Sequence, residues 1–252
     1  MRRLFFTPVG TSCLNRIPNE LKLASFDEKF NWVTNRLMMG YRQDLKMIMT
    51  YSAEIKSLLK RDINHDDMIQ FFCTDTEEGK LSGEILQNFF RSEIGCEVLL
   101  TIIPGLQALD AAKFRNVGVK SYIEELLASY NKYQYAYNIV MNITGGLKNV
   151  IPYCTIASML LSIPIYYILE HSEEIMELLI IPITLDFLLF EKYHRIFLDL
   201  VEQGAMPESE FFKTVSYEDR EPLKLLVEKN QKYYTFIALG LLLWVQYIEQ
   251  FL

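Results

Sequence analysis

The sequence predicts an α/β fold, in which helices flank a mostly parallel sheet and a small helical part follows. Short aliphatic and aromatic runs alternate with segments of helical periodicity as far as Thr184, which is typical of strands joined by crossover helices. From Asp186 onward, short charged helical segments replace the alternation. We therefore expect a first domain over residues 1–185 and a helical C-terminal domain over residues 186–252.

Within the first domain, each apolar run bounded by turn residues predicts a buried strand. The expected strands are Leu4–Thr7, Gln70–Thr74, Cys96–Ile103, Tyr137–Ile143, Ser162–Leu169 and Leu178–Ile183, the last an edge strand because it contains Pro182. Apolar residues at helical spacing predict the helices between them. These are Asp27–Lys60, Ser82–Phe90, Ala108–Lys132 and Pro152–Leu161.

In the C-terminal domain, Phe187–Gln203, Glu208–Thr214 and Glu218–Asn230 have the composition of short charged helices. Tyr234–Ile248 is apolar but contains Gly240 and Gln246, and it falls short of the roughly 20 residues that span a bilayer. We interpret it as a buried terminal helix, with an interfacial anchor as the alternative, and expect no membrane association.

Composition excludes some functions. The formal net charge of −7 argues against binding to long DNA or RNA, which depends on broad basic surfaces. A small anionic ligand held by local N–H groups remains compatible with it. The four cysteines, Cys13, Cys73, Cys96 and Cys154, are isolated and lie in or beside apolar runs. They predict buried free thiols in the cytoplasm and no metal site.

Two small-residue loops follow predicted strands. The first is Pro8-Val-Gly-Thr-Ser12, and the second is Thr144-Gly-Gly-Leu-Lys148, just before a helix. Glycines at such a corner let a ligand approach the backbone, and free N–H groups attract an anion such as a phosphate. Either loop alone could be an ordinary turn. Together they predict one ligand crevice at the carboxyl edge of the sheet.

These motifs resemble those of the CARF family, the Rossmann-like domains of type III CRISPR systems. The block Ile103–Phe114 and the strand Ile163–Ile168 are also similar to it, and the resemblance covers about Met1–Thr184. It implies a homodimer that binds a cyclic oligoadenylate messenger, tetra- or hexa-adenylate, across its two-fold axis. It also implies that the C-terminal domain is a winged-helix-like appendix, which we expect to serve packing or dimerisation because basic residues are sparse there.

The resemblance assigns ligand-binding residues by their place in the two motifs. Asp75 and Thr76, after the second strand, are secondary candidates and could instead be turn or capping residues. The expected set is Gly10, Thr11, Ser12, Asp75, Thr76, Thr144, Gly145, Gly146 and Lys148.

Some CARF proteins are ring nucleases, which cleave the messenger without metal or cofactor as a ribose 2′-hydroxyl attacks the neighbouring phosphate. In this chain Lys148 would stabilise charge and Ser12 would orient the ribose or phosphate. His65, His171 and His194 lie outside both motifs, so no strong general base is expected and turnover would be slow. The alternatives are a non-catalytic sensor module whose output domain is not in this chain, and a ligand-gated regulator whose helical end contacts DNA or protein.

Overall fold

The computed structural model describes residues 2–106, 113–146, 148–169, 172–181, 187–224 and 226–251, without the side chains of residues 238, 239, 246 and 249–251. The chain divides into two compact units, Met1–Ile181 and Pro182–Leu252. The expected domain border at residues 185 and 186 falls among residues 182–186, which lie outside the described part. So do residues 107–112 of the expected block Ile103–Phe114, and His171.

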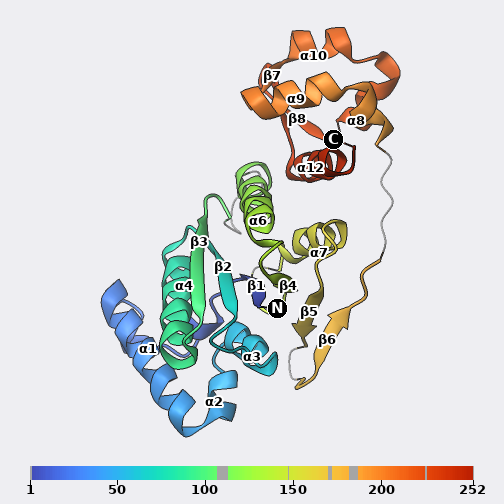
Figure 1. Cartoon of the computed structure of the whole chain (residues 1–252). Coiled ribbons are helices and arrows are strands. Elements are labelled where there is room, and N and C mark those ends of the chain that lie inside the picture. Colours follow the sequence, from blue (N-terminus) through green and yellow to red (C-terminus); the bar gives the residue numbers. More distant parts are fainter. Residues whose placement is uncertain are drawn as a thin grey trace. The chain divides into compact units, whose positions relative to one another are not determined.

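Among the described residues of the first unit, six strands form one sheet in the order β3-β2-β1-β4-β5-β6. The first five are mutually parallel, and β6 runs antiparallel to β5. This is the predicted Rossmann-like α/β fold, drawn in Figure 1. The strands are β1 Arg3–Pro8, β2 Met68–Thr74, β3 Glu97–Ile103, β4 Asn138–Asn142, β5 Ile165–Ile168 and β6 Ile175–Leu178.

The predicted edge strand was misplaced. Only Leu178 of the expected Leu178–Ile183 belongs to β6, while Leu179, Ile180 and Ile181 are exposed and outside any strand. β6 contains a glutamate among partly exposed apolar residues. As an edge strand it pairs with β5 alone, so its side chains are less completely buried than those of the central strands. The apolar run that predicted a buried strand therefore begins at the last paired residue of β6, Leu178.

Helices connect the strands, and their borders follow from local capping. The expected region Asp27–Lys60 is three helices, because Asp44 and Ser52 each accept backbone N–H groups of the turn that follows them. Thr76 caps α4 in the same way, so this helix begins five residues before the predicted Ser82. The helices are α1 Phe26–Gln43, α2 Leu45–Met49, α3 Ala53–Lys60, α4 Glu77–Phe89, α6 Lys120–Tyr133 and α7 Ile151–Leu160.

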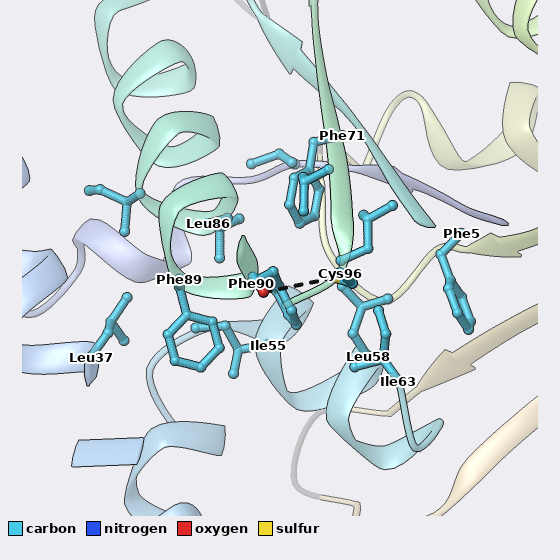
Figure 2. Packing of buried hydrophobic residues seen from close by; sticks show 14 of the residues in the cluster. Phe5, Leu37, Ile55, Leu58, Ile63, Phe71, Leu86, Phe89, Phe90 and Cys96 are labelled. Atoms are coloured by element: carbon cyan, nitrogen blue, oxygen red, sulfur yellow. Dashed lines mark hydrogen bonds between the residues drawn. The ribbon is translucent and has the colours of Figure 1, made fainter. Parts of the chain in front are cut away.

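The core lies against both faces of the sheet, because successive strand residues point to opposite sides. Phe5 packs with residues of α1, α3 and α4 in one cluster, part of which Figure 2 shows. Its neighbour Phe6 packs edge-on against Phe72, which in turn contacts Tyr122 of α6. The four cysteines are free and buried, as predicted.

The second unit has a core rich in aromatic residues, including Phe197, Phe211, Phe236 and Trp244. Among its described residues, three antiparallel strands pair in the order β7-β9-β8. Helices, a short strand, more helices, a β-hairpin and a final helix follow one another along this unit. The elements are α8 Leu188–Lys192, α9 His194–Gln203, β7 Met206–Pro207, α10 Glu208–Thr214, α11 Arg220–Leu223, β8 Val227–Asn230, β9 Tyr233–Phe236 and α12 Ala238–Phe251.

The hairpin corrects two helix predictions. The end of the expected helix Glu218–Asn230 is β8, and the start of the apolar segment at Tyr234 is in β9. Both strands are four residues long, too short for their periodicity to distinguish a strand from a helix. Among the described residues, no helix is both long enough and apolar enough to cross a bilayer.

Candidate functional site

The loops that follow β1 and β4 lie side by side at the carboxyl edge of the sheet. The two strands are adjacent and parallel, while the next strand after β1 pairs on one side and the next after β4 on the other. This is the switch point of an open α/β sheet, where ligands of such folds bind. We call residues 9–12 together with residues 143–146 and 148 the β1/β4 corner.

Glycines let the two loops of this corner approach each other closely. A Cβ at Gly10 would lie 3.2 Å from the backbone nitrogen of Gly146. Gly146 has a φ of +90°, and a Cβ there would lie 2.7 Å from the Cβ of Pro8. Position 146 therefore requires glycine for both its backbone conformation and the space available.

Glu54, in the first turn of α3, joins the loop after β1 to the helix. Its side chain is fully buried, and Oε1 accepts the Gly10 N–H at 2.8 Å. Oε2 accepts the hydroxyls of Ser12 at 3.1 Å and Ser52 at 2.6 Å. A Cβ at Gly145 would lie 2.1 Å from Oε1, so the loop after β4 closes directly over the carboxylate.

Sequence reasoning missed Glu54. An acidic residue in the first turn of a helix is common, because it complements the helix dipole, and such residues are normally solvated. The contacts that bury this one come from loops 42 or more residues away in sequence. No feature of the sequence distinguishes Glu54 from an exposed acidic residue in the first turn of a helix.

The loop after β4 is held by its own set of hydrogen bonds. Asn142, at the end of β4, donates to the Ser57 hydroxyl of α3 and accepts the N–H of Thr144. The Thr144 hydroxyl accepts the N–H of Ile168 in β5. The expected ligand residue Thr144 thus fixes the loop through its side chain.

Other expected residues at the corner are open to solvent. Thr11 and Lys148 are exposed, and Ser12 is half-buried. Lys148 makes no ion pair with the part of the chain that is described, so its ammonium is available to an anion. Burial raises the pKa of the neighbouring Cys13 thiol to about 12, which keeps it a neutral thiol rather than a thiolate nucleophile.

Asp75 and Thr76 lie on the same edge of the sheet but are committed elsewhere. Asp75 accepts the N–H of Gly105 at 3.0 Å and so ties the loop after β2 to the loop after β3. The Thr76 hydroxyl accepts the N–H of Gly79 as the N-cap of α4. We call these two loops, residues 75–76 and 104–106, the β2/β3 corner.

Of the described histidines, only His65 belongs to the first unit, and it lies away from both corners. His65 is exposed before β2, at the opposite edge of the sheet, and His194 contacts Trp244 in the second unit. No group of three or more potential metal ligands occurs among the described residues. The β1/β4 corner therefore offers N–H groups, hydroxyls and one lysine, which suit a phosphate-bearing ligand.

Comparison with known proteins identifies the family. A family described as CRISPR-associated protein (Cas_APE2256) matches residues 49–183, just over half of the chain. A solved structure of Enterococcus italicus Csm6 bound to cyclic hexa-2′-fluoro-hexa-dAMP is similar, with 10% identity and a TM-score of 0.42. That match covers 68% of this chain and 34% of the Csm6 chain, so this chain spans about a third of that protein.

A search of curated proteins finds no match. The family match agrees with the resemblance to CRISPR-associated Rossmann-like proteins that the two loop motifs suggested. It spans the second loop motif and the strands on either side of it, together with α3 and its buried glutamate. The chain belongs to this family of CRISPR-associated proteins, Cas_APE2256.

Proposed function

We propose that this protein binds a cyclic oligoadenylate across a homodimer at the β1/β4 corner and cleaves it without metal, which would end type III CRISPR signalling in the cytoplasm. The observation that carries the proposal is the meeting of two glycine loops at the switch point of the sheet, beside the exposed Lys148. Such a corner lets a sugar–phosphate backbone come close to N–H groups. Membership of a CRISPR-associated family supports this class of ligand.

Helix α7, which follows the second loop, supports the dimer. Its sequence contains no charged residue, yet Pro152 and Ile156 are exposed while Cys154 and Ala157 are buried on the opposite side. An uncharged helix face can pack against its own copy without like-charge repulsion. Because α7 begins at the corner, an isologous contact along it would bring two copies of the corner to one axis.

The cleavage that we propose is an internal transfer. The ribose 2′-oxygen attacks the adjacent phosphorus and loses its proton, the bond from phosphorus to the 5′-oxygen breaks, and that oxygen leaves as a hydroxyl. The product is an opened chain that carries a 2′,3′-cyclic phosphate at one end and a 5′-hydroxyl at the other. Lys148 would stabilise charge on the phosphate, and Ser12 would orient the ribose. Slow turnover follows from the lack of a histidine at the corner among the described residues.

In the alternative of a sensor without catalysis, the ring binds at the same site but is not cleaved. The regulator alternative is less well supported, because ion pairs occupy cations of the second unit: Lys192 with Asp219, Lys224 with Glu221 and Lys229 with Glu208. Cations that are paired within the protein contribute less to phosphate neutralisation.

One assay separates these functions. Pure protein is incubated with labelled cyclic tetra-adenylate and cyclic hexa-adenylate in EDTA, and bound and linear species are quantified. The proposal predicts tight binding of one ring and its slow conversion to shorter linear products. Binding without conversion supports the sensor, and the absence of binding to either ring rejects the proposed ligand.

The dimer has its own test. Ile156→Glu should convert the dimer to a monomer in light scattering coupled to gel filtration, because it places a charge in the proposed contact. Ala128→Glu, at an exposed position of α6, is the matched control and should leave the mass unchanged. A wild-type monomer at all concentrations, with ring present or absent, would contradict the dimer.

A further inference from the structure

The hydroxyl of Ser12 has a defined hydrogen-bonding state. A serine hydroxyl offers one donor and two acceptor lone pairs. In this protein the proton goes to Oε2 of Glu54 at 3.1 Å, and one lone pair accepts the N–H of Ala53 at 3.3 Å. One acceptor position remains, and Ser12 is half-buried at the β1/β4 corner.

We propose that Glu54 makes Ser12 an acceptor toward the ligand, so that this position selects a ribose 2′-hydroxyl rather than a phosphate oxygen. Phosphate oxygens only accept hydrogen bonds, and two acceptors facing each other would leave both unsatisfied. A ribose hydroxyl can donate, whereas 2′-deoxyribose has no group at that position. This inference rests on the proposed cyclic oligoadenylate ligand and adds the source of its selectivity for ribose.

Burial keeps Glu54 in this role. Its side chain is fully buried beneath Gly145, so it positions Ser12 without touching the ligand. Ser52 also donates to Oε2, which leaves both hydroxyl protons directed at one oxygen. A site whose polar group must be paired by the ligand discriminates strongly against an analogue that lacks the partner.

The isosteric Glu54→Gln variant should reverse the polarity of Ser12. The Gly10 N–H can only donate, so the amide oxygen of the glutamine must take the place of Oε1. Its NH₂ group then faces Ser12 and Ser52 and donates to them. The Ser12 proton is released and becomes available to a ligand oxygen, which removes the preference for a 2′-hydroxyl.

The test measures the affinity of the full chain for the cyclic tetra- and hexa-adenylates and for their all-2′-deoxy counterparts. Wild-type protein should bind the ribose ring at least about tenfold more tightly than the deoxy ring. Glu54→Gln should reduce that ratio toward one. Glu78→Gln, which removes an exposed carboxylate of α4, is the matched control and should keep the wild-type ratio.

Ser12→Ala is the second variant, in case Glu54→Gln unfolds the protein, as circular dichroism would reveal. It should also make the affinities for the two rings equal, because it weakens the binding of the ribose ring alone. Equal wild-type affinity for ribose and deoxy rings would overturn this inference and leave the proposed function standing, as would an unchanged ratio in folded Glu54→Gln or Ser12→Ala. Failure of wild-type protein to bind any ring would overturn the proposed function and, with it, this inference.

Discussion

The β1/β4 corner and the β2/β3 corner lie on the same edge of one sheet, yet they use their polar residues differently. At the β2/β3 corner, Asp75 ties two loops together and Thr76 caps a helix. At the β1/β4 corner, the buried carboxylate of Glu54 holds the loop after β1 by hydrogen bonds, and Thr11 and Lys148 remain exposed.

The difference shows that a glycine near a strand end does not by itself indicate a ligand. A Cβ at Gly79 would lie 1.9 Å from the Thr74 hydroxyl, so this glycine serves the packing of α4 at the β2/β3 corner. Gly145 likewise makes room for Glu54. At the β1/β4 corner, in contrast, buried side chains hold the loops in place. The exposed polar groups of this corner therefore remain available to a ligand.

The largest effect is expected for Gly145→Ala. Its Cβ would meet the buried Glu54 carboxylate, so we expect the free energy of unfolding to fall by about 3 kcal/mol. Gly95→Ala is the comparison variant: its φ is positive, at +76°, unlike that of Gly145, but the nearest contact of its Cβ would be an ordinary 3.9 Å. It should cost about 1 kcal/mol from backbone strain. Urea denaturation of both variants measures this, and equal losses would mean that Gly145 is not constrained by Glu54.

Lys148→Ala tests the open side of the corner. Because this ammonium is exposed and unpaired within the described chain, its removal should leave stability unchanged and weaken ring binding about tenfold. The matched variant is Lys80→Ala, an exposed lysine of α4 near the β2/β3 corner. Titration calorimetry should find its affinity close to wild type. Similar losses for both lysines would show that the two corners do not differ in ligand binding.

Thr76→Ala should have the smallest effect of the three variants. In contrast to Lys148→Ala, it should change stability and not ring affinity. Loss of the α4 cap should lower the free energy of unfolding by about 1 kcal/mol and leave ring affinity unchanged. Thermal denaturation and the binding assay together check this. A clear loss of affinity without a loss of stability would place Thr76 in the ligand site and remove the contrast between the corners.

Much of the fold was accessible from the sequence because five strands are apolar runs ended by turn residues. The short strand β6 was misplaced, and the residues of β8 and β9 were assigned to helices, since four residues with mixed or aromatic character carry little periodicity. Their position depends on pairing with neighbours rather than on their own composition.

The candidate site was accessible only in outline. Small residues after β1 and β4 predicted where two loops meet, and strand order places those loops together. Glu54 was not predictable, because its burial depends on loops distant in sequence that close over it. Consequently the acceptor state of Ser12 could be recognised only from the structure.

Hydrogen exchange measured with and without the bound ring reports where the ligand lies on the protein. We expect slower exchange of backbone amides in residues 9–13 and 144–150, with residues 75–79 unchanged. Protection at residues 75–79 while both glycine loops exchange as in the free protein would contradict it.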